Sequence, residues 1–372
     1  MAEIRKPIMD IDQPGLQVEI NSYKPGDGLT WKQLFPLKYT QKFDIKGLEG
    51  TDGIPVAADR VAFNTKAPKK TRKTIGTWSG KLGKYAVSRE KDEIECVEYL
   101  DAQTLAAKNE DAAAARDLVD QVYDDVKFCH EAMDYKVELD TCRIASSGIH
   151  SFPASIEGDM ATEDVINFNV PKENFLGVTN KWSDAENADG LQDLADAQKK
   201  IIKAGGSKPN FAFMEKEKFE QLCKQKATLK HLYPQLTAEQ LGLVSADLVD
   251  VARINTYMRG KGYPQIGVLD TYVTLEKKDG TKELIKPWNV NVVTLSPTQQ
   301  LGWTYYKTVP TAKGTAAIQA YGAYYKVTIW GEVNPMLEGT MAEAYVQPGL
   351  INRRSLMFIN TDNDKWANGA SK

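Results

Sequence analysis

A long stretch without proline or glycine is the strongest constraint on how this chain of 372 residues can fold. Neither residue occurs between Cys96 and Ser147, and apolar side chains recur there at intervals of three or four. The stripe consists of Ala112, Ala115, Val119, Val122, Val126, Cys129, Met133 and Val137. This spacing predicts an amphipathic helix over about residues 97–143 that spans about 70 Å. A break near Lys108–Asp111 is the alternative to one rod, and Gly148 supplies the stop.

Two neighbouring segments carry opposite charge. Residues 60–89 hold nine basic side chains and no acidic one, whereas residues 90–140 hold sixteen acidic and five basic side chains, a net of −11. The basic residues are densest at Lys66, Lys69, Lys70, Arg72 and Lys73. The acidic residues on the polar face of the predicted helix include Asp117, Asp120, Asp124 and Asp125. The contrast suggests that the two segments contact each other.

The whole chain has the composition of an ordinary soluble globular protein, with 42% hydrophobic and 26% charged residues and a net charge of −3. A dedicated nucleic-acid-binding domain is usually strongly basic, so the basic segment needs a local explanation. No apolar run approaches the roughly 18 residues of a membrane span, and no signal peptide is visible, so we expect no membrane contact. Four cysteines without a C-x-x-C pair favour folding in a reducing compartment.

Motifs for catalysis are incomplete in this sequence. GTWSGKL at 76–82 has the wrong spacing for a phosphate-binding loop, and Leu82 replaces the required hydroxyl. His130-Glu131 begins like a zinc-protease motif, but the second histidine is missing and the chain has three histidines in all. We therefore expect that the protein is not an enzyme and has no catalytic residues, no cofactor and no metal site. We interpret Cys129 as a core residue.

The order of segments predicts an α+β fold. Prolines interrupt residues 1–44, which we interpret as an extended arm that lies along another surface. Residues 45–92 alternate like two strand legs around a charged tip and predict an extended hairpin. Helices are expected at 189–205 and 215–227, strands at 209–214, 288–297 and 321–333, and a hairpin at 272–288.

A basic hairpin that leads directly into an acidic helix points away from that helix. Pairing between copies of the chain is therefore easier than pairing within one copy, and such a heterologous contact closes into rings or lattices. Solvation of both charged segments is one alternative. Nucleic-acid binding through residues 66–73 is another, and it predicts a steep dependence on salt.

Three segments carry a resemblance to a known family. They are residues 180–222 (NKWSDAENADGLQDLADAQKKIIKAGGSKPNFAFMEKEKFEQL), 271–297 (TYVTLEKKDGTKELIKPWNVNVVTLSP) and 334–362 (NPMLEGTMAEAYVQPGLINRRSLMFINTD). With the order of arm, hairpin and long helix, the chain resembles tailed-phage major capsid proteins of the HK97-like fold, in the lambda-type subgroup. The resemblance implies an N-terminal arm (1–44), an extended loop (45–92), a peripheral domain (93–185 and 329–372) with the spine helix, and an axial domain (186–328).

The resemblance also implies a structural role. Copies are expected to form hexamers and pentamers of an icosahedral shell around double-stranded DNA, contacted non-specifically at the inner face. The basic residues of the loop would contact the helix aspartates of a neighbour. Scaffolding, portal and possible decoration proteins would be partners, and the virion capsid, assembled in the host bacterial cytoplasm, would be the location. Because the sequence begins with Met1 and no charged helical segment precedes the arm, we expect a separate scaffolding protein. An encapsulin-like nanocompartment shell is the alternative.

Overall fold

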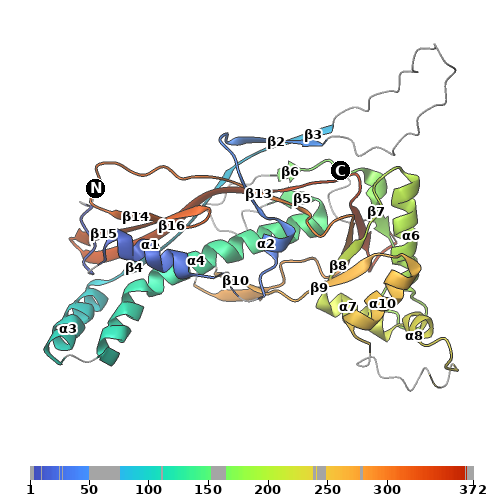
Figure 1. Ribbon diagram of the computed structural model, residues 1–372, viewed down its shortest axis with the longest axis horizontal. Coiled ribbons are helices and arrows are strands. Elements are labelled where there is room, and N and C mark those ends of the chain that lie inside the picture. Colours follow the sequence, from blue (N-terminus) through green and yellow to red (C-terminus); the bar gives the residue numbers. More distant parts are fainter. Residues whose placement is uncertain are drawn as a thin grey trace, which may run out of the picture.

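The molecule is elongated, with a long sheet and a long helix side by side and a second, smaller sheet with its helices towards one end (Figure 1). The computed structural model describes residues 4–9, 11–24, 26, 28–49, 76–109, 112–151, 165–237, 240, 249–276, 280–364 and 366. Helices and strands are mixed along the chain, as the α+β prediction requires. None of the helices in the described ranges is both long and apolar enough to cross a bilayer.

The long sheet is built around one strand of 15 residues, β16. Its strands are β1 (Leu37–Tyr39), β13 (Gly302–Lys307), β16 (Met336–Leu350), β15 (Tyr325–Val333), β14 (Ile318–Tyr321) and β4 (Gly83–Lys91). Both β15 and β4 pair antiparallel with β16 over nine residues each. Buried Val327, Ile329, Ala342 and Ala344 give this sheet an apolar face.

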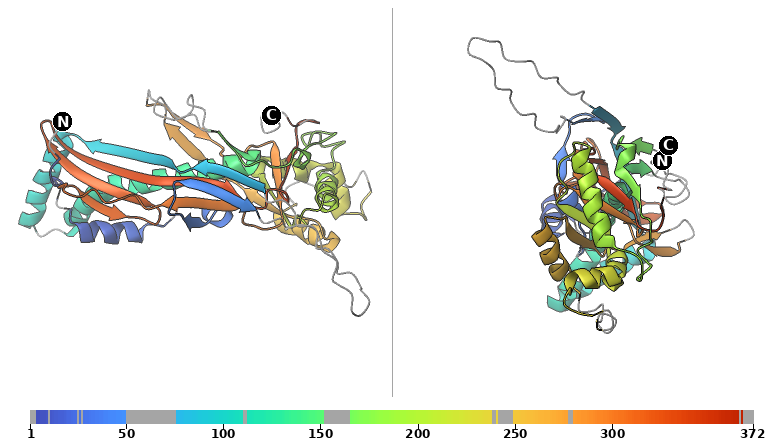
Figure 2. Two further views of the ribbon diagram at one scale, coloured as in Figure 1. Left: turned by 90° about the horizontal axis from the view of Figure 1, so that it is seen from above. Right: turned by 90° about the vertical axis from the view of Figure 1, so that its right-hand side faces the viewer.

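The long helix is α4 (Ala112–Ser147), which runs along the long sheet (Figure 2). The predicted apolar stripe is confirmed at Val122, Val126, Cys129, Met133 and Val137, which are all buried. The helix ends where Gly148 takes φ +72° and donates its N–H to the carbonyl of Ile144 at 2.9 Å. The apolar periodicity therefore identified both the buried face and the stop.

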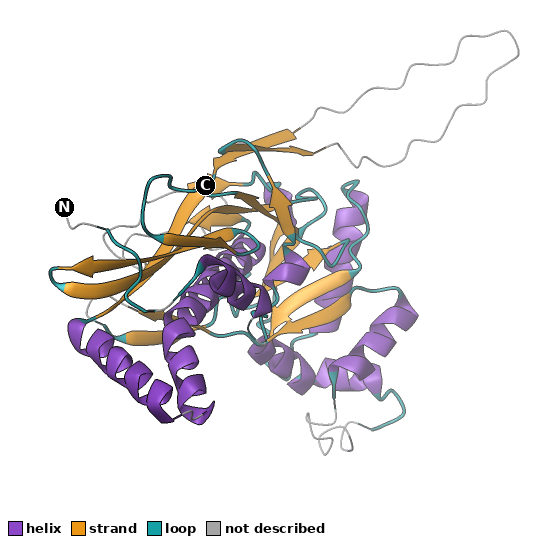
Figure 3. Ribbon diagram, turned by 60° about the vertical axis from the view of Figure 1, so that its left-hand side comes forward, coloured by secondary structure: helices purple, strands orange, loops and turns teal. Residues whose placement is uncertain are grey.

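The helical stretch is two helices, not one rod. Helix α3 (Glu93–Asn109) precedes α4 and packs beside it (Figure 3). A reciprocal capping box begins α3: the Glu95 N–H donates to Asp92 and the Asp92 N–H donates to Glu95, both at 3.0 Å. Residues 110 and 111 lie outside the described residues, at the position where a break was the alternative prediction.

The smaller sheet has the strand order β7 (Phe175–Gly177), β17 (Met357–Asn360), β12 (Val292–Ser296), β8 (Phe211–Glu215) and β9 (Gln265–Leu269). Its helices are α6 (Gly190–Lys203), α7 (Lys216–Lys224), α8 (Lys226–Leu232) and α10 (Val251–Lys261). Buried Trp182, Leu194, Leu222 and Met258 belong to the core that joins these helices to the sheet. The minor elements are the pair β5 (Ile149–Ser151) and β6 (Val165–Asn167), the 3-10 turn Lys172–Asn174, and the predicted hairpin β10 (Val273–Glu276) and β11 (Lys282–Ile285).

Residues 1–44 do more than lie along the surface. They contain α1 (Gln13–Ser22), with Asp12 as its N-cap and Pro14 in its first turn, and α2 (Trp31–Leu34). Leu16 and Trp31 are fully buried in the core beneath α4 and the long sheet. The arm was expected to have no core of its own, and it shares the core of the body instead.

Strand pairing crosses the predicted segment boundaries at several strands, since β1 of the predicted arm and β4 of the predicted loop pair in the long sheet, and β7 of the predicted peripheral segment pairs in the smaller sheet. Strands β13 and β14 fall inside the predicted axial segment 186–328, yet they pair within the long sheet. Strand β17 falls inside the predicted peripheral segment 329–372, yet it pairs with β12 of the smaller sheet. The chain passes between the two sheets more often than predicted from contiguous segments, because strands that are distant in the sequence pair with one another.

Candidate inter-subunit interface

The foot of the predicted loop is an antiparallel hairpin of β2 (Asp44–Glu49) and β3 (Gly76–Lys81), with Asp44 opposite Lys81. Trp78 anchors it: the ring is buried and packs edge-on against Phe168, with ring centroids 4.8 Å apart. The five basic residues of the predicted contact, Lys66, Lys69, Lys70, Arg72 and Lys73, lie outside the described residues. The structure thus supports a hairpin at this place in the chain, while the contact made by its basic residues stays a prediction.

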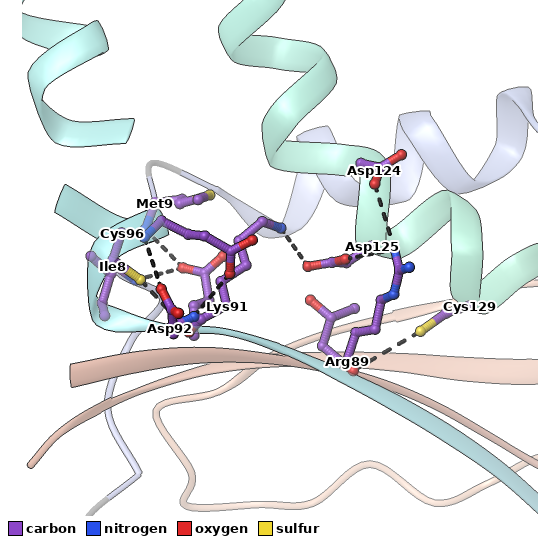
Figure 4. A network of polar contacts seen from close by, with 12 residues as sticks. Ile8, Met9, Arg89, Lys91, Asp92, Cys96, Asp124, Asp125 and Cys129 are labelled. Carbon is purple, nitrogen blue, oxygen red and sulfur yellow. Dashed lines mark hydrogen bonds and ion pairs between the residues drawn. The ribbon is translucent and has the colours of Figure 1, made fainter. Parts of the chain in front are cut away.

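The predicted acceptors lie on the first half of α4. Asp117 and Asp120 belong to the described helix, although their side chains fall outside the description. Asp124 is 69% exposed, and its carboxylate lies 3.6 Å from the guanidinium of Arg89 on β4 (Figure 4). Exposure leaves the Asp124 carboxylate open to a second cation.

The environment of Asp125 differs from that of the exposed Asp124. Its carboxylate is buried and lies 2.5 Å from the ammonium of Lys91 and 3.4 Å from the guanidinium of Arg89 (Figure 4). Lys91 is also buried, so the pair is shielded from solvent and joins β4 to α4 within one subunit. Asp125 therefore serves the fold of its own chain, and the predicted contact with a neighbour rests on the other aspartates.

The acidic residues further along α4 are also used internally. Asp134 accepts the Tyr324 hydroxyl at 2.8 Å, and Asp140 accepts the Lys136 ammonium at 3.1 Å. Glu138 is fully buried and accepts the backbone N–H groups of Thr30 and Trp31 at 2.9 and 2.7 Å. Of the acidic residues of α4 whose side chains are described, Asp124 and Glu131 are exposed and the others are buried.

A second buried glutamate holds the arm in a similar way. Glu338 on β16 accepts the backbone N–H groups of Ile8 and Met9, each at 2.8 Å. Burial raises the pKa of Glu338, although the hydrogen bond from Met9 and the charge of Lys91 oppose the shift. Sequence reasoning missed both glutamates as arm contacts; the only available signal was an acidic residue within an otherwise apolar pattern.

Glu343, on the same strand, has the opposite electrostatic balance. It lies 2.7 Å from Lys326 and 2.9 Å from Lys84. Burial alone would raise its pKa, but the hydrogen bonds from Lys326 and Lys84 outweigh burial and lower it. This carboxylate therefore fixes β4, β15 and β16 to one another through charge.

Within the described residues we find neither a disulfide nor a cluster of metal-binding side chains. All four cysteines are free and buried, and burial raises the pKa of the Cys129 thiol to about 11. No group of three or more histidine, cysteine, aspartate or glutamate side chains there is placed to hold a metal ion.

The arrangement of arm, hairpin, long helix, long sheet and smaller sheet is the HK97-like capsid fold. No protein-family model and no curated protein sequence matches the chain. Among solved structures, a protein assigned as a prophage capsid protein of E. coli CFT073 aligns with a TM-score of 0.56 at 14% identity, over 95% of this chain and 99% of that one.

Two further structures place this likeness in context. A phage-related protein of Bordetella bronchiseptica RB50 aligns with a TM-score of 0.51 at 13% identity, over 97% and 98% of the two chains. An encapsulin of Synechococcus elongatus PCC 7942 aligns over 97% and 99% of the chains, with a TM-score of only 0.37 at 9% identity. At these identities the likeness establishes the fold, and the lambda-type subgroup stays a prediction.

Proposed function

We propose that this chain is a major capsid protein of a tailed phage, whose copies assemble as hexamers and pentamers into an icosahedral shell around double-stranded DNA. The observation that carries the proposal is the fold shared with the prophage capsid protein over nearly the full length of both chains. A structural role agrees with the incomplete catalytic motifs of the sequence. The shell belongs to the virion and is assembled in the host bacterial cytoplasm.

The contact between subunits is proposed to join the basic loop of one copy to the acidic helix of the next. Lys66, Lys69, Lys70, Arg72 and Lys73 act as donors, and Asp117, Asp120 and Asp124 act as acceptors. The exposed carboxylate of Asp124 supports this assignment, since Arg89 satisfies it only from one side at 3.6 Å. Individual exposed pairs contribute about 0–1 kcal/mol, so the contact fixes register through many repeats.

Other partners follow from the proposed role. A scaffolding protein guides assembly, a portal occupies one vertex, and decoration proteins are candidates for the outer surface. Packaged DNA touches the inner surface without sequence preference, through charge.

Electron microscopy of the purified chain at low and at high salt tests the proposal. Closed shells at low salt are expected, with fewer shells at high salt because ions screen the exposed loop-to-helix pairs. A variant with the five basic loop residues changed to Gln should form fewer shells. The matched control changes to Gln five exposed lysines of α6 and α7, Lys199, Lys200, Lys203, Lys216 and Lys224, and should assemble normally.

Uniform small particles from the chain alone would require co-expression with the neighbouring genes, and uniform small particles after co-expression would contradict the shell function. Tight duplex binding that weakens steeply with salt, measured by filter binding, would instead favour a nucleic-acid-binding protein that uses residues 66–73. The genes next to the gene for this chain distinguish the two kinds of shell. Terminase and portal genes are expected beside the gene of a phage shell, and the gene of a cargo enzyme is expected beside that of an encapsulin-like shell.

A further inference from the structure

A groove of about 800 Å³ lies at the foot of the hairpin of β2 and β3. Its lining comes from β1, β2, β3, β13 and the end of β16, so elements from distant parts of the chain meet there. Trp78 and Tyr305 in this lining are buried, whereas Tyr39 is 54% exposed. The volume is sufficient for several side chains of a partner.

The rim of this groove is basic. Lys38, Lys42 and Lys46 line it and are exposed, against the single acidic residue Asp44. The Lys38 ammonium lies 5.2 Å from the centre of the Trp303 ring, and no ion pair of the three lysines occurs within the described residues. A groove that combines aromatic surface with exposed lysines suits a partner that is both apolar and acidic.

The outer face of α3 has this combination. Cys96 and Tyr99 face the core, and the outer side of the helix presents Ile94 and Val97, which are 68% and 44% exposed. The acidic residues on that side are Glu93, Glu98 and Asp101, and no basic residue occurs between 93 and 104. Ile94, Val97, Glu98 and Asp101 share one stripe because they are spaced by three, four and seven positions.

One chain cannot bring these two surfaces together. Helix α3 lies at one end of the long sheet, whereas the hairpin of β2 and β3 lies beyond the middle of the molecule (Figures 1 and 2). Since the surfaces differ and are separated in one copy, their contact requires a second copy and is heterologous. Such contacts close into rings or extend into lattices, as a shell requires.

We propose that the outer face of α3 docks into the groove at the foot of the hairpin of a second copy of this chain. The apolar side chains of α3 cover the aromatic lining, and its carboxylates meet the three lysines of the rim. The contact rests on the proposed shell function and adds a second inter-subunit contact to that of the basic loop. It also explains why large apolar side chains stay exposed on a helix that is otherwise charged.

Cysteine pairing between copies tests the contact directly. Lys42→Cys and Glu98→Cys are prepared as separate variants, mixed and allowed to assemble before mild oxidation. Disulfide-linked pairs are expected in the mixture and not in either variant alone, because each copy contributes a different surface. The matched control replaces Lys42→Cys by Lys200→Cys on α6, which should give no linked pairs with Glu98→Cys.

Charge reversal tests the chemistry of the contact in the same assay. Lys38→Glu with Lys46→Glu in the first partner, or Glu93→Lys with Asp101→Lys in the second, should each lower the yield of linked pairs about tenfold. Both reversals together should restore the yield, which simple misfolding would not do.

The outcomes distinguish this contact from the proposed function. Shells of the unmodified chain together with no linked pairs from the mixed variants would overturn the α3 contact and leave the shell function intact. An equal yield in the reversed and restored combinations would also overturn it. Failure of the unmodified chain to associate even when it is co-expressed with the neighbouring genes would overturn both proposals.

Discussion

Helices α3 and α4 are neighbours in the chain, and both are rich in acidic residues, yet they use those residues in opposite ways. On α3 the carboxylates of Glu93, Glu98 and Asp101 are exposed beside exposed Ile94 and Val97. On α4 four carboxylates, Asp125, Asp134, Glu138 and Asp140, are buried among partners from the arm, β4 and the long sheet, while Glu131 is exposed. The same residue type therefore stays open to solvent along α3 and is mostly used for contacts inside the subunit in the second half of α4.

The difference follows from the number of surfaces that cover each helix. Helix α4 is contacted by α1, α2, β4, β16 and α3, so few of its side chains described from Val122 onward are exposed. A buried carboxylate is tolerated only with hydrogen-bond or charge partners, and the structure supplies them at Asp125, Asp134 and Glu138. Helix α3 is less covered, and its exposed Glu93, Glu98 and Asp101 remain in contact with solvent, so they need no partner within the chain.

The largest expected effect comes from Glu138→Ala on α4. The change leaves the N–H groups of Thr30 and Trp31 buried without an acceptor, so the free energy of unfolding should fall by about 3–5 kcal/mol. Urea denaturation followed by Trp fluorescence measures the loss. Glu98→Ala on α3 is the matched control and should change stability by less than about 0.5 kcal/mol. Equal effects of the two changes would remove the contrast between the helices.

A somewhat smaller effect is expected for Asp125→Leu, which leaves the buried Lys91 ammonium without its partner. The free energy of unfolding should fall by about 2–4 kcal/mol, and the double variant Asp125→Leu, Lys91→Met should recover most of it. The same denaturation assay gives the coupling between the two residues. Additive losses in the double variant would show that the pair does not act as a unit.

The pH dependence of stability sharpens the comparison within β16. The pKa of Glu338 is raised in the folded state, so folded Glu338 binds a proton more readily, and its contribution to stability declines as the pH rises above 4.5. The pKa of Glu343 is lowered, so its contribution is present above 4.5 and is lost as the pH falls below that value. Each glutamate should be changed to Gln and the variants denatured with urea on both sides of pH 4.5.

The two variants should deviate from the unmodified chain in opposite directions. Removal of Glu338 should make stability decline less as the pH rises, and removal of Glu343 should make it decline less as the pH falls. A deviation of the same sign in both variants would contradict the assignment of their charge partners.

The smallest effect on stability is expected for Asp124→Ala, because its carboxylate is exposed and its one cation partner lies at 3.6 Å. The free energy of unfolding, measured by thermal denaturation, should change by less than about 0.5 kcal/mol. If Asp124 forms an ion pair with a basic residue of a neighbouring copy, the variant should nevertheless form fewer shells, and electron microscopy counts them. Normal assembly of this variant would exclude Asp124 from the inter-subunit contact.

Much of the fold was accessible from local patterns. The apolar stripe of α4, its end at Gly148, the hairpin of β10 and β11, and strands such as β8 and β12 were predicted from spacing and turn residues. These features depend on neighbours within a few positions along the chain. The core role of Cys129 was predicted for the same reason and is confirmed by its complete burial.

The candidate site was only partly accessible. Charge density identified Asp124 and Asp125 together, but it could not show that one is exposed and the other is paired with Lys91. The groove of Lys38, Lys42 and Lys46 escaped sequence reasoning because Trp303 and Tyr305 join it from a strand more than 250 positions away. Helix α1 was missed although Asp12 and Pro14 are recognisable start signals.

Local sequence patterns were sufficient to locate α4, α6, α7 and several strands, to identify the apolar face of α4, and to delimit the two segments of opposite charge. Three features became visible only in the folded chain. They are the carboxylates that bind partners inside the subunit, the burial of Leu16 and Trp31 of the arm in the shared core, and the strand order within each sheet. The physical reason is range: periodicity and capping act over a few residues, whereas burial and ion pairing depend on surfaces that distant segments bring together.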